Sequence, residues 1–342
     1  MSGVRHVVVG ADEAEQRLDR WFGRQFPHLT HGRLEKMCRK GEVRVDGARA
    51  KASTRVRPGQ TIRVPPLPAG APPFDQPAEP MVPDSAEAEA IQATVLYRDD
   101  HVLVIDKPPG LAVQGGTGQH RHLGAMLPAL RFERPGDPRP VHRLDKDTSG
   151  LLVLARTGVA AVALSRAFRS RAVEKIYLAA VAGRPDPLAG RIRYGLVKAG
   201  GKGSEKMRVL HPDDVGATEG ARTAMTDYRV LEAAAQRASA VALRPVTGRT
   251  HQLRAHMAAL GTPIAGDGKY GGRGQENKGD GWGAGLGGAL SRKLHLHAAR
   301  LVLPHPVEER SLMLTAPLPE HMARSWAFFG WDPALPDPVF DE

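Results

Sequence analysis

The sequence predicts an α+β fold in two domains, with a mainly antiparallel sheet in the larger one. Strand-like apolar runs follow one another without the regular spacing of βαβ units, which favours antiparallel pairing. A chain of 342 residues is long enough for two domains on the usual prior of roughly 150 residues each. We expect a small domain at 14–65, a proline-rich acidic linker at 66–90 and a large domain at 91–330.

The composition excludes several classes of protein. Hydrophobic residues make up 41% of the chain, enough to build a core, which excludes wholesale disorder. The single cysteine, Cys38, excludes a disulfide scaffold, a zinc ribbon and an iron–sulfur site. No apolar run approaches the roughly 18 residues of a membrane-spanning helix, and the first residues lack the pattern of a secretory signal. We therefore expect a cytoplasmic protein without a membrane partner.

The charge is strongly basic and unevenly distributed. The net charge is +11; residues 1–70 carry +7, residues 71–90 carry −5, and the remainder carries +9. Two basic bodies indicate a polyanionic partner, most often nucleic acid, although a merely soluble basic protein is the alternative. Eight prolines between Pro65 and Pro83 exclude a helix or a ladder strand there, so the spacer is expected to be an extended linker.

The small domain is predicted to contain two helices and a few short strands. Apolar residues recur at helical spacing in residues 17–26, and a second helix is expected at 32–39, before Gly41. Residues 43–45 and 61–64 alternate as strands do, and Asp46-Gly47 is a tight-turn signal. The second helix should direct a row of cations outward, towards phosphates: Arg33, Lys36, Arg39 and Lys40.

This order of elements resembles the RNA-binding domain named after ribosomal protein S4. The matching stretches are RLDRWF, RLEKMCRKGEVRVDG and PGQTIRV. The resemblance implies a small α/β domain that holds structured RNA by its backbone.

In the large domain, the segment 141–157 (VHRLDKDTSGLLVLART) carries the strongest chemical signal. A charged loop leads into the buried-strand pattern Leu151–Leu154, which places Asp145 at the mouth of an apolar element. Such a carboxylate either accepts backbone amides in the loop or takes part in chemistry, and the pattern alone leaves both open. Upstream, a strand pair at 95–105 is followed by a glycine-rich loop at 114–118 that could approach phosphates.

Three further clusters accompany this loop. They are RSRAVEKIYLAAVAG at 169–183, LRPVTGRTHQLRAH at 243–256 and IAGDGKY at 264–270. The His251 and His256 pair lacks an acidic third ligand nearby, so we expect no metal site. The histidines at 295, 297 and 305 lie in a strand-like segment and are expected to be structural or solvent-facing.

Together these motifs resemble the RluA family of pseudouridine synthases over about residues 93–320. The matches are LYRDDHVLVIDKPPGLAVQGGTG, HRLDKDTSGLLVLA, EKIYLAAVAG and RPVTGRTHQLRAHMAALGTPIAGDGKY, in the family's order. The GGTG loop and the S4-like domain are most similar to the RluC branch. The resemblance implies a mainly antiparallel mixed sheet, a large-subunit ribosomal RNA substrate or its assembly intermediate, no metal and no nucleotide or other cofactor. We expect a monomer.

The resemblance also assigns the site. Asp145 stands at the position of the family's catalytic aspartate, Arg254 at its ion-pairing arginine, and Tyr177 at the tyrosine that lies against the target uracil. Arg143 resembles the side chain that fills the space left when the base leaves the helix, and Arg249 is a further expected RNA contact. The aspartate could attack C1′ of the sugar, stabilise its positive charge or take a proton from C2′.

The sequence also allows three alternative functions. A transfer RNA pseudouridine synthase would differ only in substrate, and a non-catalytic ribosome-assembly factor would need only the basic domains. A glycoside hydrolase would need a second acid at a set distance, and Asp147 is too close in sequence to serve. The glycine-rich stretch 271–288 leaves the RNA contacts on that side undefined.

Overall fold

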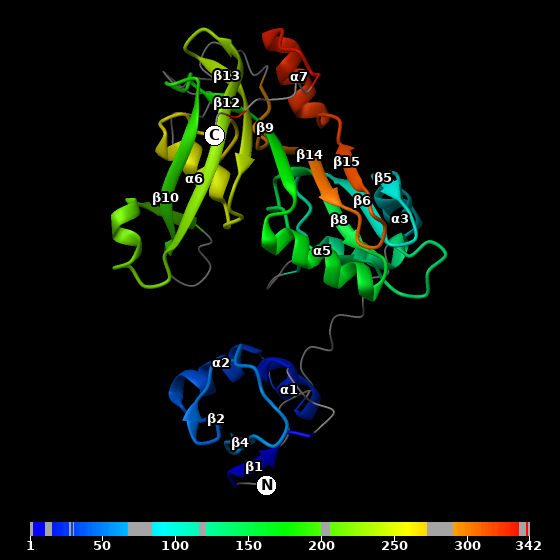
Figure 1. Cartoon of the computed structure of the whole chain (residues 1–342), viewed down its shortest axis with the longest axis vertical. Helices are drawn as coiled ribbons and strands as arrows, with labels where there is room; N and C mark the ends of the chain where they lie inside the picture. Colours follow the sequence, from blue (N-terminus) through cyan, green and yellow to red (C-terminus); the bar gives the residue numbers. More distant parts are fainter. Residues whose placement is uncertain are drawn as a thin grey trace. The chain divides into compact units, whose positions relative to one another are not determined.

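A computed structural model describes residues 3–10, 16–26, 29, 31–67, 84–115, 121–199, 206–271, 290–334 and 340. The chain divides into two compact units, Met1–Met81 and Val82–Glu342 (Figure 1). Most of the expected linker and of the stretch 271–288, and the end of the loop 114–118, lie outside the described residues.

The first unit packs two helices on a small antiparallel sheet. Its helices are α1 (Leu18–Gln25) and α2 (His31–Lys40), and its strands lie in the order β1 (Arg5–Val8), β4 (Thr61–Val64), β2 (Arg44–Val45) and β3 (Ala48–Arg49). Trp21, Phe22 and Phe26 pack against one another and form the centre of the core. Asp46 and Gly47 both have positive φ and form the predicted tight turn. Strand β1 was not predicted from the sequence.

The second unit is built on one large mixed sheet, as the sequence and its resemblance predicted. The path of paired strands runs through β11 (Lys206–Leu210), β10 (Ala189–Ala199), β12 (Arg222–Ala234), β13 (Ala238–Pro245), β9 (Glu174–Ala182), β14 (Leu296–Pro304), β8 (Ser149–Ala155), β6 (Val102–Lys107) and β5 (Val95–Arg98). Strand β15 (Ser311–Thr315) pairs with β14, and β7 (Arg139–Pro140) pairs with β8. The described pairs are antiparallel except β14 with β8.

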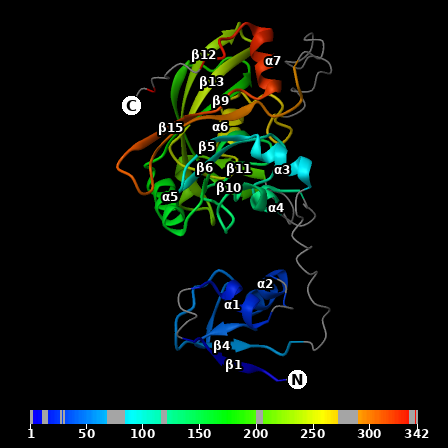
Figure 2. The same ribbon diagram turned by 90° about the vertical axis from the view of Figure 1, so that its right-hand side faces the viewer.

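Helices cover this sheet and carry several of the site residues. They are α3 (Ser85–Gln92), α4 (Leu123–Met126), α5 (Gly158–Ser170), α6 (Gln252–Ala259) and α7 (Glu320–Phe329). Helix α6 lies beside β10, β12 and β13, and α5 lies beside β8 (Figure 1). Helix α7 lies at the end of the unit that holds the ends of β12 and β13 (Figure 2). Among the described residues, no helix has the length and apolarity needed to cross a bilayer.

Gly150 is required where the parallel pair begins. It has φ +105°, and a Cβ there would lie 2.3 Å from the carbonyl oxygen of Ala298 on β14. Substitution of Gly150 by alanine should therefore cost about 3 kcal/mol or more of unfolding free energy, because both the backbone conformation and the strand spacing must change. Urea unfolding measures this, with Gly158→Ala as the control, since a Cβ at Gly158 meets nothing within 4 Å. Equal unfolding midpoints for the two variants would contradict this role of Gly150.

Four buried histidines should make the second unit sensitive to acid. Burial lowers the pKa of His256, His295 and His297 to about 4, and it also lowers the pKa of His321. These groups are neutral in the folded state but bind protons near pH 6.5 when unfolded. The contribution of these neutral histidines to the unfolding free energy is therefore fully present above about pH 6.5. It is lost as the pH falls towards 4, by about 3 kcal/mol or more in total. Urea midpoints at pH 7 and pH 5 that are equal would contradict this.

Candidate active site

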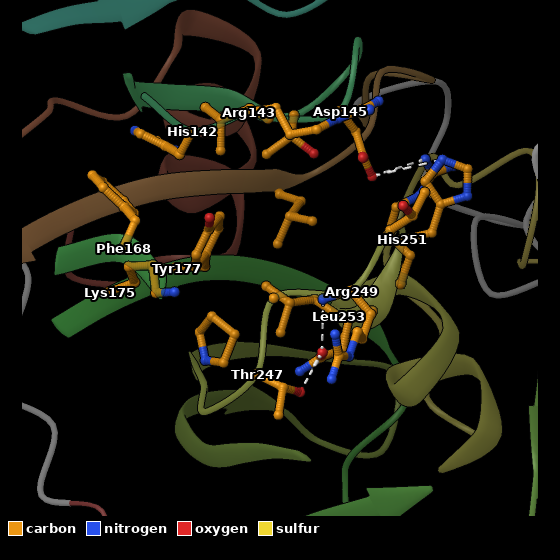
Figure 3. Close-up of a pocket in the computed structure, with 18 residues that line it drawn as sticks. His142, Arg143, Asp145, Phe168, Lys175, Tyr177, Thr247, Arg249, His251 and Leu253 are labelled. Carbon is orange, nitrogen blue, oxygen red and sulfur yellow. Dashed lines mark hydrogen bonds and ion pairs between the residues drawn. The ribbon is translucent and has the colours of Figure 1, made fainter. Parts of the chain in front are cut away.

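A pocket of about 290 Å³ lies where four segments of the second unit meet. It is lined by the loop before β8, the end of α5, strand β9, and the turn that leads into α6. Figure 3 shows the loop with Arg143 and Asp145 on one side, Tyr177 and Lys175 of β9 below it, and His251 directed towards Asp145. This volume is near the lower end of the roughly 300–1,000 Å³ typical of small-ligand sites.

The loop that carries Asp145 is held by packing and by backbone hydrogen bonds. The His142 ring stacks on Phe168, with centroids 4.2 Å apart, and its Nε2 accepts the backbone N–H of Val153 at 3.0 Å. Burial, assisted by the charge of Lys175, lowers the pKa of His142 to about 3, so the ring is neutral. The loop closes with the N–H of Thr148 donating to the carbonyl of Asp145. These contacts fix the position of the loop backbone at Asp145.

A buried lysine lies beneath the same loop. Lys107, at the end of β6, is fully buried and donates from Nζ to the carbonyls of Pro108, Leu111 and Lys146 at 2.9–3.0 Å. Burial lowers its pKa to about 8, while the carboxylates of Asp147, Asp145 and Asp106 oppose that shift. Its ammonium group links the end of β6 to the carbonyl of Lys146, the residue that follows Asp145.

The carboxylate of Asp145 faces two side chains of the α6 segment. Its Oδ2 lies 3.6 Å from Nη1 of Arg254 and 3.8 Å from Nε2 of His251. Within the described part of the chain, these two side chains are the ion-pair partners of Asp145. The sequence pattern also allowed a carboxylate that accepts hydrogen bonds from backbone amides of its own loop, and the structure places Asp145 against the side chains instead. Both distances exceed a hydrogen-bond length, so the carboxylate can still accept hydrogen bonds from a bound molecule. The Asp145 side chain is 18% exposed, in keeping with its place in the pocket wall.

Arg254 is itself buried and held by a second aspartate. Its Nε and Nη2 both lie 2.7 Å from the two oxygens of Asp267, in a bidentate pair. Burial opposes the charged state of Arg254, but the hydrogen bonds and charge of Asp267, with the charge of Asp145, raise its pKa overall. A permanent positive charge thus faces the Asp145 carboxylate at 3.6 Å.

Tyr177 projects from β9 into the pocket. Burial raises the pKa of the phenol above its ordinary value, and the negative charge of Asp145 adds to that rise. The side chain therefore stays neutral at physiological pH and offers an aromatic face within reach of the electrostatic influence of Asp145.

The remaining predicted residues divide between the pocket rim and the first unit. Arg143 and Arg249 are exposed and line the pocket, and Nε of Arg249 donates to the carbonyl of Thr223 at 3.2 Å. The four cations predicted on the second helix are exposed on α2, as expected: Arg33, Lys36, Arg39 and Lys40. They belong to the other unit and are not part of this pocket.

The histidines of the C-terminal strand region are buried, which corrects the solvent-facing alternative. Nδ1 of His297 contacts Ser149 Oγ, Nε2 of His295 contacts Ser325 Oγ, and Nε2 of His305 contacts Asp99. Strand β14 is paired on both sides, and its Ala299 packs with Met322 and Trp326 of α7, so its first half is buried. Within the described ranges, no group of three or more His, Cys, Asp or Glu residues is placed to hold a metal ion.

Several residues in or beside the pocket were not singled out from the sequence. Lys107 is buried beneath the loop, and Lys175 lines the pocket, where burial lowers its pKa. Asp267 and Tyr270 were noted only as part of a cluster. An apolar strand ending in Lys107 and Pro108 was the one available signal for a buried lysine.

Comparisons with known proteins agree with this architecture. The family model described as RNA pseudouridylate synthase matches residues 101–259, and the S4 domain model matches residues 16–62. A Vibrio cholerae protein named ribosomal large subunit pseudouridine synthase C is 36% identical over 94% of this chain and 96% of its own length. The Escherichia coli K12 protein of the same name is 34% identical over 94% and 95%.

Solved structures show the same fold in the second unit. The human RNA pseudouridylate synthase domain containing 4 structure has a TM-score of 0.58 and 31% identity, covering 71% of this chain and 95% of that one. The human domain containing 1 structure has a TM-score of 0.51 and 27% identity, covering 72% and 96%.

Proposed function

This chain belongs to the RNA pseudouridylate synthase family, and on that basis we propose that it converts uridines of large-subunit ribosomal RNA to pseudouridine in the pocket around Asp145. The observation that carries the assignment of the site is the carboxylate of Asp145, held between Arg254 and His251 at an open pocket wall. The names of the bacterial relatives support the substrate, since they match over nearly their whole lengths.

The reaction is an isomerisation, so atoms are rearranged and none is gained. The N1–C1′ bond breaks, the uracil turns, and a C5–C1′ bond forms. The proton on C5 leaves, and N1 takes a proton from solvent. The target base must first leave its stack, because C1′ and C5 are otherwise out of reach. The pocket has room for one such nucleoside.

Asp145 is proposed to act at the sugar. A carboxylate can attack C1′ as the glycosidic bond breaks, stabilise the developing positive charge, or remove the C2′ proton. Each role requires an ionised carboxylate in a partly dry site. Arg254 places a permanent positive charge beside that carboxylate, with its nearest nitrogen 3.6 Å from Asp145.

Tyr177 and Arg143 are proposed to hold the displaced base and its surroundings. The neutral phenol ring of Tyr177 supplies a stacking face for the uracil. Burial and the charge of Asp145 both disfavour a phenolate there, so in the free protein Tyr177 is not a base ready to take the C5 proton. Arg143 is exposed on the rim, where it can enter the space that the base leaves in the helix.

The lining of the pocket argues against a glycoside hydrolase. Such enzymes use two carboxyl groups that flank the scissile bond. Among the described residues that line this pocket, Asp145 is the sole acid. The nearby Asp267 is fully buried and occupied by Arg254 in a bidentate pair.

The substrate class is tested by tritium release from RNA labelled at uracil C5. We expect release from large-subunit ribosomal RNA, or from a particle in its assembly, and none from bulk transfer RNA. Release from transfer RNA alone would keep the reaction and overturn the substrate. Binding without release from any of these RNAs would indicate an assembly factor.

We propose that the first unit holds the RNA through the exposed cations of α2. If Arg33, Lys36, Arg39 and Lys40 are replaced by glutamine, the slope of log affinity against log salt should fall by about 1–4, about 1 for each phosphate that is no longer neutralised. The single-turnover rate at saturating RNA should not change, because the pocket belongs to the other unit. An unchanged salt slope would overturn this role.

We propose further that the protein acts as a monomer in the cytoplasm. The ribosomal relatives support the compartment. We propose no cofactor, because the isomerisation needs neither an electron carrier nor an activated nucleotide.

A further inference from the structure

The turn at 264–270 has no part in the chemistry described above, yet the fold fixes its position. Ala265 donates its N–H to Ala180 of β9, and its carbonyl accepts the N–H of His295. Gly266 has φ +73°, and a Cβ there would lie 2.0 Å from the carbonyl oxygen of Lys293. The next residue, Asp267, is therefore presented from a turn that is anchored on β9 and on His295, which directly precedes β14.

Asp267 determines which nitrogen of Arg254 faces Asp145. Its carboxylate takes Nε and Nη2 of Arg254 at 2.7 Å each, which leaves Nη1 directed to Asp145 at 3.6 Å. Oδ1 of Asp267, which accepts Nη2 of Arg254, also accepts the N–H groups of Lys269 and Tyr270 at 2.9 and 3.1 Å. Since a guanidinium is planar, fixing one edge fixes the direction of the other.

The hydroxyl of Tyr270 is placed to select which nitrogen of His251 carries the proton. Its hydroxyl oxygen accepts the N–H of Met207 at 2.8 Å and lies 3.0 Å from Nδ1 of His251. Burial raises the pKa of Tyr270, so the hydroxyl keeps its proton and can donate it to Nδ1. A neutral imidazole with Nδ1 as acceptor carries its own proton on Nε2, the nitrogen that lies 3.8 Å from Asp145.

His251 is also held in an uncommon backbone conformation. It has φ +51°, in the left-handed region, at the start of α6. A non-glycine residue in that region costs about 1 kcal/mol or more and persists where surrounding contacts impose it. The hydroxyl of Tyr270 is one such contact, and the ring of Tyr270 also lies 5.4 Å from the guanidinium carbon of Arg254.

We propose that Asp267 and Tyr270 are positioning residues that together orient the two donors facing Asp145, Nη1 of Arg254 and Nε2–H of His251. The inference rests on the proposed function, because it assigns the purpose of these contacts to the carboxylate that acts on the sugar. With both donors fixed in advance, the carboxylate keeps one orientation when the nucleoside enters, and no reorganisation is needed during the reaction.

Tyr270→Phe is the sharper test, because it removes one hydroxyl and leaves the ring. We expect the single-turnover rate of tritium release from large-subunit ribosomal RNA to fall about 10-fold or more, with RNA affinity within about 2-fold of wild type. The matched control is Tyr228→Phe, which also removes a buried hydroxyl, one that donates to the carbonyl of Pro187 at 2.9 Å. A similar loss of rate in the control would overturn the proposal.

A double-mutant cycle then shows whether Tyr270 acts through His251. In a His251→Ala background, Tyr270→Phe should change the rate by less than about 2-fold, since the imidazole that it orients is gone. The same fold loss in both backgrounds would show that Tyr270 does not act through His251, and would overturn that half of the proposal.

Asp267→Asn tests the other half. We expect a fall of about 100-fold in the single-turnover rate with RNA binding retained, because the guanidinium is no longer held by two charged bonds. Asp227→Asn is the control, since Asp227 is 2% exposed and pairs with Arg191 and Arg244 away from the pocket. An equal loss in the control, or a normal rate in Asp267→Asn, would overturn the role of Asp267.

The outcomes separate this inference from the proposed function. A wild-type protein that releases no tritium would overturn the function itself. Suppose instead that Asp145→Asn abolishes the wild-type rate, whereas Tyr270→Phe and Asp267→Asn both keep it. That result would overturn the positioning role and leave the proposed function intact. If Asp267→Asn fails to fold, the Tyr270→Phe rate and its cycle with His251 decide the proposal.

Discussion

Replacing Asp145 with asparagine should lower the single-turnover rate of pseudouridine formation by about 1,000-fold or more. The amide has the shape of the carboxylate but cannot attack C1′, stabilise a positive sugar or take the C2′ proton. RNA affinity should stay within about 2-fold, because Asp145 is one small group in a basic protein, and phosphate contacts usually dominate the affinity of such proteins for nucleic acid. Tritium release and filter binding measure the two quantities separately.

Asp147→Asn is the matched control for that experiment. Asp147 is an exposed carboxylate two residues along the same loop, and it does not line the pocket of Asp145. We expect its rate to remain within about 3-fold of wild type. A comparable loss in both variants would show that the loop, and not the Asp145 carboxylate, carries the effect.

Replacing Arg254 with alanine should both destabilise the fold and abolish most of the activity. Two carboxylates, Asp145 and Asp267, would lose the cation that they share. Breaking a buried pair in this way costs about 3–5 kcal/mol of unfolding free energy. The rate should fall at least about 100-fold, because no fixed cation would then face the Asp145 carboxylate. Urea unfolding and single-turnover tritium release measure the two effects.

The double variant Arg254→Ala with Asp267→Ala separates stability from catalysis. It removes Asp267 as well as Arg254, so the fully buried carboxylate is no longer left without its partner, and stability should recover in part relative to Arg254→Ala alone. The activity should not recover, since no cation faces Asp145. Recovery of activity together with stability would show that Arg254 acts only on the fold.

Local patterns in the sequence predicted the elements well, because their causes lie within a few residues. The apolar spacing of Leu18, Trp21 and Phe22 predicted α1, and Asp46-Gly47 predicted a turn that the positive φ values confirm. Strand β1 could not be predicted in this way. It pairs with β4, more than fifty residues later, and three of its four residues are exposed, so no apolar alternation indicates it.

In the site, too, local motifs were predictable from the sequence, and contacts between distant segments were not. Asp145, Tyr177 and Arg254 were found by resemblance, and the structure brings all three to one pocket. The contacts among them depend on distant segments that sequence patterns cannot join. Lys107 lies beneath the loop because β6 pairs with β8, and Asp267 reaches Arg254 because its turn is anchored on β9. The burial of His297 likewise depends on Ser149, 148 residues earlier in the chain.

The most direct test of the proposed reaction is the nucleoside composition of the RNA after incubation with the protein. Large-subunit ribosomal RNA is incubated with the wild-type protein and with Asp145→Asn, digested to nucleosides and separated by chromatography. We predict that pseudouridine appears mole for mole as uridine disappears, that no free uracil is released, and that Asp145→Asn leaves the RNA unchanged. Free uracil with abasic sugar would instead show hydrolysis, and pseudouridine formed by Asp145→Asn at the wild-type rate would remove Asp145 from the mechanism.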